Sequence, residues 1–231
     1  MTTDGIRDSG FGVRIPNPES RIPSLCAIVD TEAAAHAGWT PIDLARAFLD
    51  GGARFLQLRA KQLAGAVFLD TASAIVELAG ASGAIVIVND RADIARLAGA
   101  AGVHIGQEDL APRDVRTVVG DDAMVGLSTH TVEQLERALD EPVNYVAIGP
   151  VFGTVTKHTG YEAIGLGRVA DASRRAAARG LPLVAIGGIT LERAASVIEA
   201  GAASVAVIGA LLATGDPERQ TRDFLHRINN H

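Results

Sequence analysis

Eight short apolar runs, each followed by a stretch with helical periodicity, limit the folds open to this sequence more than any other feature. Runs such as Ala84-Ile-Val-Ile-Val88 are continuous and β-branched, which is typical of strands buried on both faces of a parallel sheet. Helix signals lie between them, as at Thr40 and Pro41, an N-cap residue followed by proline at the first helical position. The predicted strands are residues 25–29, 54–59, 84–88, 102–105, 123–127, 145–148, 182–186 and 204–208, and the predicted helices begin near residues 41, 65, 92, 112, 132, 168, 191 and 217.

Eight strand–helix units joined by short loops predict an α/β fold, a single (β/α)8 TIM barrel. The chain has 231 residues, 48% of them hydrophobic, which is enough to fill one large core. A doubly wound open sheet is the alternative, but no glycine-rich dinucleotide motif follows the first strand. We expect the catalytic barrel domain to span residues 21–231, and residues 1–20, which lack apolar periodicity, to form a disordered or loosely attached tail.

Charge and hydropathy exclude several classes of partner. The net charge of −6 argues against a general nucleic-acid binder, which would carry a basic stripe. No segment reaches the roughly 18 apolar residues of a membrane span, and the polar N-terminus lacks the apolar stretch of a secretory signal. The single cysteine, Cys26, lies in a predicted strand and is expected to be a core residue. We therefore expect a cytoplasmic protein with small-molecule substrates and with no nucleic-acid or membrane partner; the sequence does not give its oligomeric state.

The second predicted strand ends in a concentration of anion-binding side chains. Because side chains alternate along a strand, Gln57, Arg59 and Lys61 point to one side, and Leu56 and Leu58 to the other. Arginine and lysine donate charge-assisted hydrogen bonds to anionic oxygens, so this group suits a phosphate or pyrophosphate. An amphipathic edge strand with a solvated polar face is the alternative interpretation.

In a barrel the carboxyl ends of all strands share one mouth, so polar residues at these ends should meet. Asp90 and Asp109 follow neighbouring strands, and two carboxylates are typical ligands of Mg²⁺, which takes its other ligands from water and substrate phosphate. A helix cap at Asp90 and a turn at Asp109 are the alternatives. The polar or glycine residues expected at this mouth are Gln57, Arg59, Lys61, Asn89, Asp90, Gln107, Asp109, Ser128, His130, Thr154, Thr156, Lys157, Gly187, Gly188 and Gly209.

A second anion site is expected after the last two strands. Gly187, Gly188 and Gly209 allow backbone N–H groups to approach a phosphate near helix N-termini, although tight turns also require glycine. The long loop 149–167 carries Thr154, Thr156 and Lys157 and is predicted to fold over bound ligands, a disordered surface loop being the alternative. Lys61 and Lys157 are the two lysines among 21 basic residues, and both follow predicted strands.

The predicted mouth is rich in anion binders and poor in acid–base groups. His130 follows Ser128 closely, but this spacing does not indicate a Ser–His–Asp arrangement. His104 lies inside a predicted strand, where a core histidine is expected. Such a site suits the departure of a pyrophosphate leaving group whose charge is stabilised by cations.

In these motifs the chain resembles the thiamine-phosphate synthase family, from about residue 25 to the C-terminus. The matching segments are Gln57-Leu-Arg-Ala-Lys61, Asn89-Asp90-Arg91, residues 102–109, Ser128-Thr-His130, residues 149–157 and residues 185–189, in the order of the family. Two positions depart from its pattern. Gly209 stands where the family often has serine, and Ala60 replaces a common acidic residue between Arg59 and Lys61.

The resemblance implies a transferase. The expected reaction condenses 4-amino-2-methyl-5-pyrimidinylmethyl diphosphate with 4-methyl-5-(2-phosphooxyethyl)thiazole, or its carboxylated form, to thiamine phosphate and pyrophosphate, by a dissociative mechanism assisted by Mg²⁺. It also implies site residues: Gln57, Arg59, Lys61, Asn89, Ser128 and Lys157 for the pyrimidine diphosphate; Asp90 and Asp109 for Mg²⁺; Thr154, Thr156, Gly188, Ile208 and Gly209 for the thiazole phosphate; and Arg59, Lys61 and Lys157 for the charge of the leaving group.

Three other functions are compatible with parts of this pattern. A thiazole tautomerase of the same barrel family would use an acid–base residue such as His130 but would not need the Arg59–Lys61 group or both aspartates. A Schiff-base aldolase would use Lys61 or Lys157 as nucleophile and leave the aspartates unexplained. A non-catalytic sensor of thiamine precursors would keep the pocket without turnover.

Overall fold

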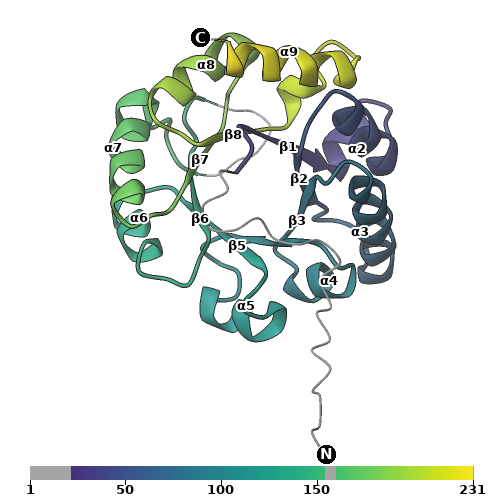
Figure 1. Ribbon diagram of the computed structural model, residues 1–231, viewed down its shortest axis with the longest axis horizontal. Helices are drawn as coiled ribbons and strands as arrows, with labels where there is room; N and C mark the ends of the chain where they lie inside the picture. The colour runs from purple at the N-terminus through teal and green to yellow at the C-terminus, as the bar shows by residue number, and fades with distance from the viewer. Residues whose placement is uncertain (1–21, 154–159, 231) are drawn as a thin grey trace, which may run out of the picture.

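The computed structural model describes residues 22–153 and 160–230, and these residues form one closed parallel barrel surrounded by helices (Figure 1). The strands are β1 (Leu25–Asp30), β2 (Phe55–Arg59), β3 (Ile85–Asn89), β4 (Gly102–Ile105), β5 (Met124–Thr129), β6 (Tyr145–Ile148), β7 (Leu183–Ile186) and β8 (Ser204–Val207). The helices are α1 (Thr31–His36), α2 (Pro41–Asp50), α3 (Gly65–Gly80), α4 (Ala92–Leu97), α5 (Pro112–Val119), α6 (Val132–Ala138), α7 (Gly165–Ala178), α8 (Leu191–Glu199), α9 (Pro217–Asn229) and the 3₁₀ helix η1 (Gly209–Leu211). The predicted (β/α)8 barrel is therefore confirmed.

The elements differ from the prediction only locally. The short helices α1 and η1 were not predicted, and α7 begins at Gly165 instead of 168. The predicted cap of α2 is present, since the Thr40 hydroxyl accepts the Asp43 N–H at 3.1 Å and Pro41 is the first helical residue. The predicted tail, residues 1–20, lies outside the described residues. No helix in the described part of the chain is long and apolar enough to cross a membrane.

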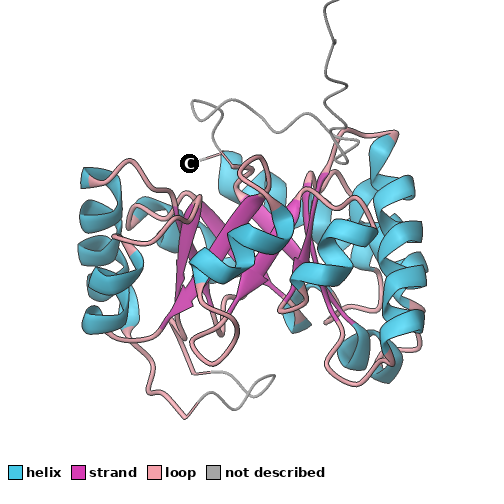
Figure 2. Cartoon of the chain, turned by 90° about the horizontal axis from the view of Figure 1, so that it is seen from below, coloured by secondary structure: helices cyan, strands magenta, loops and turns pink. Residues whose placement is uncertain are grey.

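Parallel pairing continues around the barrel and closes between its first and last strands, with Ala27 of β1 opposite Val207 of β8. Side-on, the strands run between two flanks of helices (Figure 2). Alternate residues of each strand belong to two separate hydrophobic clusters. On β2, Leu56 and Leu58 pack outward in the larger cluster, between the strands and the helices, whereas Phe55 belongs to the cluster that fills the barrel. The polar residues that share the register of Phe55 therefore face the interior of the barrel.

A few large side chains fill the interior at the amino ends of the strands. The Tyr145 ring is 1% exposed, lies edge-on to Phe55 with centroids 6.0 Å apart, and fits only because residue 126 is glycine. A Cβ at Gly126 would lie 2.0 Å from Cζ of Tyr145. Cys26 belongs to the same cluster, as predicted, and burial raises the pKa of its thiol far above the usual range.

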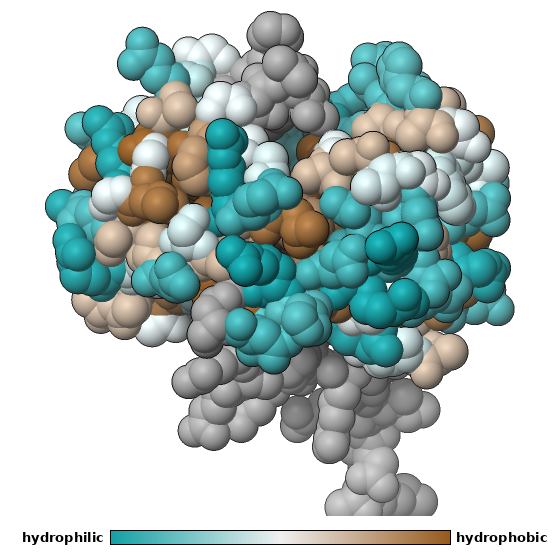
Figure 3. Space-filling model, turned by 90° about the horizontal axis from the view of Figure 1, so that it is seen from above, coloured by the Kyte–Doolittle hydropathy of each residue, from teal (hydrophilic) through white to brown (hydrophobic). Residues whose placement is uncertain are grey.

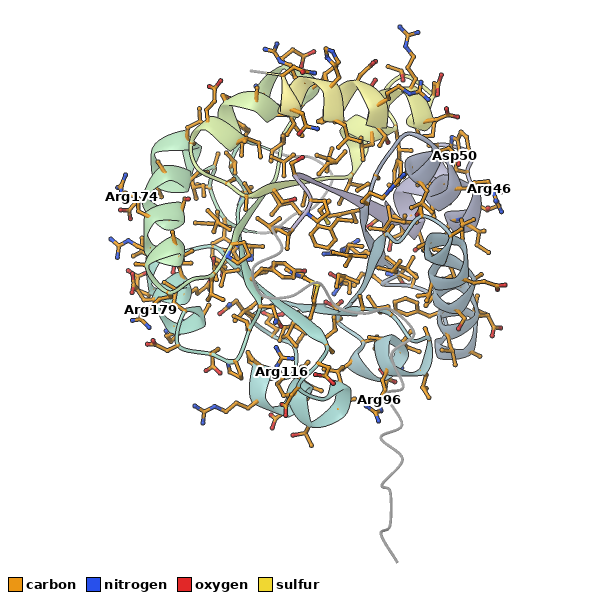
Figure 4. The ribbon with its side chains drawn as sticks, in the orientation of Figure 1. Arg46, Asp50, Arg96, Arg116, Arg174 and Arg179 are labelled. Carbon is orange, nitrogen blue, oxygen red and sulfur yellow. The ribbon has the colours of Figure 1, made fainter. Side chains whose placement is uncertain are left out.

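The outer faces of the helices are polar. Arg46, Arg96 and Arg174 project from the helical ring into solvent (Figure 4), and hydrophilic residues cover much of the face shown in Figure 3. The polar residues of functional interest instead lie at the carboxyl ends of the strands.

Candidate active site

The carboxyl end of β2 carries the three predicted anion-binding residues. Gln57 is buried among the interior residues, with 6% of its surface exposed, and Arg59 ends the strand two residues further on, facing the same way. Lys61 follows just beyond the strand, with 43% of its side chain exposed. The alternative of a solvated edge strand is wrong, because β2 pairs with β1 on one side and β3 on the other.

Arg59 is held by a residue that sequence reasoning did not assign to the site. Its guanidinium donates to Oδ2 of Asp30, directly opposite on β1, and only 6% of the Asp30 side chain is exposed. The other carboxylate oxygen of Asp30 accepts the Ala33 N–H at 2.9 Å and so caps α1. The carboxylate thus fixes both the start of α1 and the position of the guanidinium.

Lys61 connects the anion-binding group to the two aspartates. Its Nζ lies 2.5 Å from Oδ2 of Asp90, at the end of β3. Asp90 has a φ of 65°, the one positive φ among the described non-glycine residues, and its N–H donates to the His104 carbonyl at 2.8 Å. A strained backbone of this kind is concentrated at functional sites. The helix-cap interpretation of Asp90 is wrong, since the N-cap residue of α4 is Arg91.

Asp109 stands close to Asp90. Burial raises the pKa of Asp109, and the Asp90 carboxylate adds to this, while the Gly106 N–H and the Lys61 ammonium act against it. Oδ2 of Asp109 accepts the Gly106 N–H at 2.7 Å, so the turn predicted as the alternative is also present.

Two neighbouring carboxylates form a donor set that fits a hard divalent cation. Within the described residues no group of three or more His, Cys, Asp or Glu side chains is gathered for a metal. A cation held by Asp90 and Asp109 would therefore need further ligands from water and from a substrate, as is usual for Mg²⁺.

A chain of hydrogen bonds runs from the barrel interior to the mouth. The Tyr145 hydroxyl lies 2.9 Å from Nδ1 of His104, and Nε2 of His104 lies 2.8 Å from Oγ of Ser128. His104 is thus a satisfied core histidine, as predicted, and it orients Ser128. The Ser128 carbonyl in turn accepts from the Gln107 amide at 2.7 Å.

On the opposite side of the mouth lies a cavity of about 710 Å³ at the ends of β7 and β8. Its walls include Ser128 and three residues predicted for the thiazole phosphate: Gly188, Ile208 and Gly209. Gly188 has a φ of 63°, and a Cβ there would lie 2.5 Å from the Gly153 carbonyl oxygen. The glycine is therefore required by the turn geometry, and it also brings the backbone to the cavity wall.

Helix α8 starts at this cavity. Its N-cap residue, Thr190, makes no capping hydrogen bond through its side chain, although the Arg193 N–H donates to the Thr190 carbonyl at 3.1 Å and the Glu192 carboxylate also lines the cavity. Arg193 in that turn adds a positive charge, stacks 4.6 Å above the Phe152 ring and donates to the Gly188 carbonyl at 3.1 Å.

His130 also reaches the cavity, but in a fixed position. Its Nδ1 donates to the Gly149 carbonyl at 2.6 Å, and its ring stacks on Tyr161, with centroids 4.2 Å apart. These contacts hold the ring in one orientation.

The structure thus brings together most of the predicted residues in two groups. Gln57, Arg59, Lys61, Asp90 and Asp109 lie around the ends of β2 to β4, and Gly188, Ile208 and Gly209 line the cavity, with Ser128 in its wall. Asn89 ends β3 next to Asp90. Thr154, Thr156 and Lys157 lie outside the described residues.

Sequence reasoning missed three residues of the mouth: Asp30, Arg193 and Gln220. Asp30 ends a strand, a signal that would have identified it. Arg193 and Gln220 belong to helices that follow β7 and β8, and no strand-end signal marks them.

Comparison with known proteins gives one consistent result. The family model described as thiamine monophosphate synthase matches residues 25–211. The chain is 42% identical to the thiamine-phosphate synthase of Roseiflexus sp. (strain RS-1) over 201 residues, which cover 87% of this chain and 83% of the relative. It is 43% identical to that of Anaeromyxobacter dehalogenans, covering 78% and 80% of the two chains. Among solved structures, thiamine phosphate pyrophosphorylase from Pyrococcus furiosus superposes with a TM-score of 0.80 at 25% identity, over 89% of this chain and 95% of that one.

Proposed function

The chain belongs to the thiamine monophosphate synthase family, and on that premise we propose how its residues join a pyrimidinylmethyl diphosphate to a thiazole phosphate. It is a transferase of thiamine biosynthesis, with thiamine phosphate as its product. The proposal concerns the roles of individual residues, the metal ion and the order of bond changes.

The pyrimidine diphosphate binds at the ends of β2 and β3. Gln57, Arg59 and Asn89 lie at the carboxyl ends of these strands and face the interior of the barrel. The Lys61 ammonium lies beside them, close to the Asp90 carboxylate. Ser128, oriented by His104, supplies a hydroxyl from the opposite wall, and Lys157 completes the set from the loop 149–167. Cationic and amide donors at one place stabilise a diphosphate more than a single phosphate, because each added oxygen finds a partner.

Asp90 and Asp109 would hold Mg²⁺ beside the diphosphate. The bound ion would neutralise charge on the diphosphate oxygens and so make them a better leaving group. The Lys61 ammonium lies 2.5 Å from Oδ2 of Asp90, so the anion-binding group and the carboxylates meet at one place, and this pairing is the single observation that carries the proposal.

The thiazole phosphate occupies the cavity at β7 and β8. The N-terminus of α8 and the backbone at Gly188 and Gly209 face its phosphate, and Thr154 and Thr156 contribute hydroxyls from the loop. The hydrophobic residues among the cavity walls, including Ile186 and Ile208, exclude water from the reacting carbon.

The bond to the diphosphate breaks first. Arg59, Lys61 and Lys157 stabilise the negative charge that develops on the departing oxygen, and the thiazole nitrogen then captures the pyrimidinylmethyl cation. No proton has to be removed in these two steps, which fits a mouth where His130 is held by the Gly149 carbonyl.

The test is a reaction with purified protein, Mg²⁺, the pyrimidine diphosphate and the thiazole phosphate, followed by measurement of thiamine phosphate and pyrophosphate. Equal amounts of the two products are expected. Arg59→Lys serves as a variant, because lysine cannot reproduce the planar guanidinium between Asp30 and a diphosphate, and its rate should fall. Proton exchange on the thiazole phosphate without thiamine phosphate would instead identify a tautomerase and direct attention to His130.

A further inference from the structure

Gln220 is a buried polar residue with no visible structural task. It lies in the first turns of α9 with 8% of its surface exposed, and its N–H continues the helix by donating to the Asp216 carbonyl at 3.0 Å. Within residues 22–153 and 160–230, its side-chain amide has no hydrogen-bond partner. The two N–H donors of this amide are therefore available to a ligand.

The amide faces the cavity. Within the described residues the Ser204 hydroxyl is the one fully enclosed side-chain polar group without a partner, so the amide of Gln220 must reach accessible space. Gln220 lines the cavity of about 710 Å³, together with Thr214 and Gly209. Side chains on a helix lean toward its N-terminus, which here is the end at the cavity.

The neighbourhood of Gln220 favours an anion. Helix α9 contacts η1, which begins at Gly209, and the first turn of α8 lies in the same wall with the Arg193 guanidinium and the Glu192 carboxylate. Gly209 has no side-chain donor, so this wall lacks a hydroxyl or amide from position 209. The amide of Gln220 offers two N–H donors in the same cavity.

We propose that Gln220 binds the phosphate of the thiazole substrate by donating an amide hydrogen bond to a phosphoryl oxygen. The inference rests on the assignment of the thiazole phosphate to this cavity. Gln220 is thus a substrate-binding residue that acts before the chemical step.

The decisive variant is Gln220→Met, which keeps the volume and removes the donors. Binding of the thiazole phosphate and of its dephosphorylated alcohol is measured by calorimetry, and KM is measured for both substrates. A hydrogen bond to a charged group predicts an affinity for the phosphate about 10-fold to 100-fold weaker, with unchanged affinity for the alcohol. The KM of the pyrimidine diphosphate should not change.

Two further variants separate binding from structure. Gly209→Ser in the Gln220→Met background should restore much of the phosphate affinity, because the backbone at Gly209 is outside the positive-φ region and a serine hydroxyl would return a donor to this wall. Arg222→Ala, on the exposed face of α9 where Arg222 pairs with Glu218, is the control and should leave both affinities unchanged. A structural role would instead lower the melting temperature of Gln220→Met, which the proposal predicts to stay equal or rise.

Equal affinity of wild type and Gln220→Met for the thiazole phosphate would overturn the proposal, as would an equal loss for phosphate and alcohol. Formation of thiamine phosphate by the same variant would show in either case that the proposed function stands. Absence of turnover in the wild type would count against the function, while the calorimetric comparison would still decide the role of Gln220.

Discussion

Replacement of Gly126 by alanine should damage both the fold and the site through one buried ring. The added Cβ would lie 2.0 Å from Cζ and 2.4 Å from the hydroxyl oxygen of Tyr145. The ring cannot move aside easily, because Phe55 meets it edge-on and His104 stacks on it at 5.5 Å. Overpacking costs about 1–3 kcal/mol, and loss of the Tyr145–His104 hydrogen bond adds about 1 kcal/mol.

Urea unfolding measures the first effect and substrate kinetics the second. We expect the free energy of unfolding of Gly126→Ala to fall by about 2–4 kcal/mol. The KM of the pyrimidine diphosphate should rise as well, because a displaced His104 no longer orients Ser128. Gly80→Ala is the control, since nothing lies within 4 Å of a Cβ there and alanine favours the helix.

A double variant tests the cause. Tyr145→Leu removes the atoms that Gly126→Ala would meet, so the two changes together should destabilise less than the sum of their separate effects. An unfolding free energy of Gly126→Ala equal to that of the wild type, or strict additivity in the double variant, would refute the reasoning.

Three further predictions follow from buried or charged groups. Arg116→Lys should lower the urea midpoint without changing either KM, because the guanidinium donates through Nε to the Pro142 carbonyl at 3.0 Å and through a second nitrogen to Asn144 Oδ1 at 2.5 Å. The one nitrogen of a lysine cannot occupy both positions, and an unchanged midpoint would contradict this. Cys26 should resist alkylation in the folded protein and react only on unfolding, because burial raises its thiol pKa; fast labelling of native protein, read by mass spectrometry, would disprove it. In metal-free protein the pKa of Asp109 is raised, so protonation of this carboxyl stabilises the folded state below pH 3.8, its ordinary pKa, and this stability is lost as the pH rises through the raised pKa. Asp109→Asn should therefore flatten this part of the curve of unfolding free energy against pH, and an unaltered curve would count against the shift.

Much of the barrel could be predicted from local patterns. The apolar runs predicted all eight strands, because a strand that is buried on both faces is marked by its own continuous run of apolar residues. The alternation at Leu56, Gln57 and Leu58 correctly separated the helix-facing side from the interior. Helix α1, with six residues, and η1, with three, are too short for periodicity to show.

The contacts within the site required tertiary structure. That Arg59 meets Asp30 depends on the register of β1 against β2, and the Tyr145–His104–Ser128 chain joins three different strands. Gln220 lies on a helix whose sequence places it on a buried face but does not reveal the cavity beyond it. Strand-end position predicts which residues share the mouth, while their pairing is decided by register and side-chain length.

The rate of pyrophosphate release as a function of Mg²⁺ concentration tests most directly whether the two aspartates and Lys61 drive the departure of the diphosphate. Wild-type protein is compared with Asp90→Asn, which tolerates the φ of 65° and retains the shape of the side chain, and with Asp109→Asn. We predict no release without Mg²⁺, saturation in the wild type, and a large rise in the Mg²⁺ requirement of both variants. Release that continues in the presence of a chelator, or identical Mg²⁺ curves for all three proteins, would contradict the proposed role of these carboxylates.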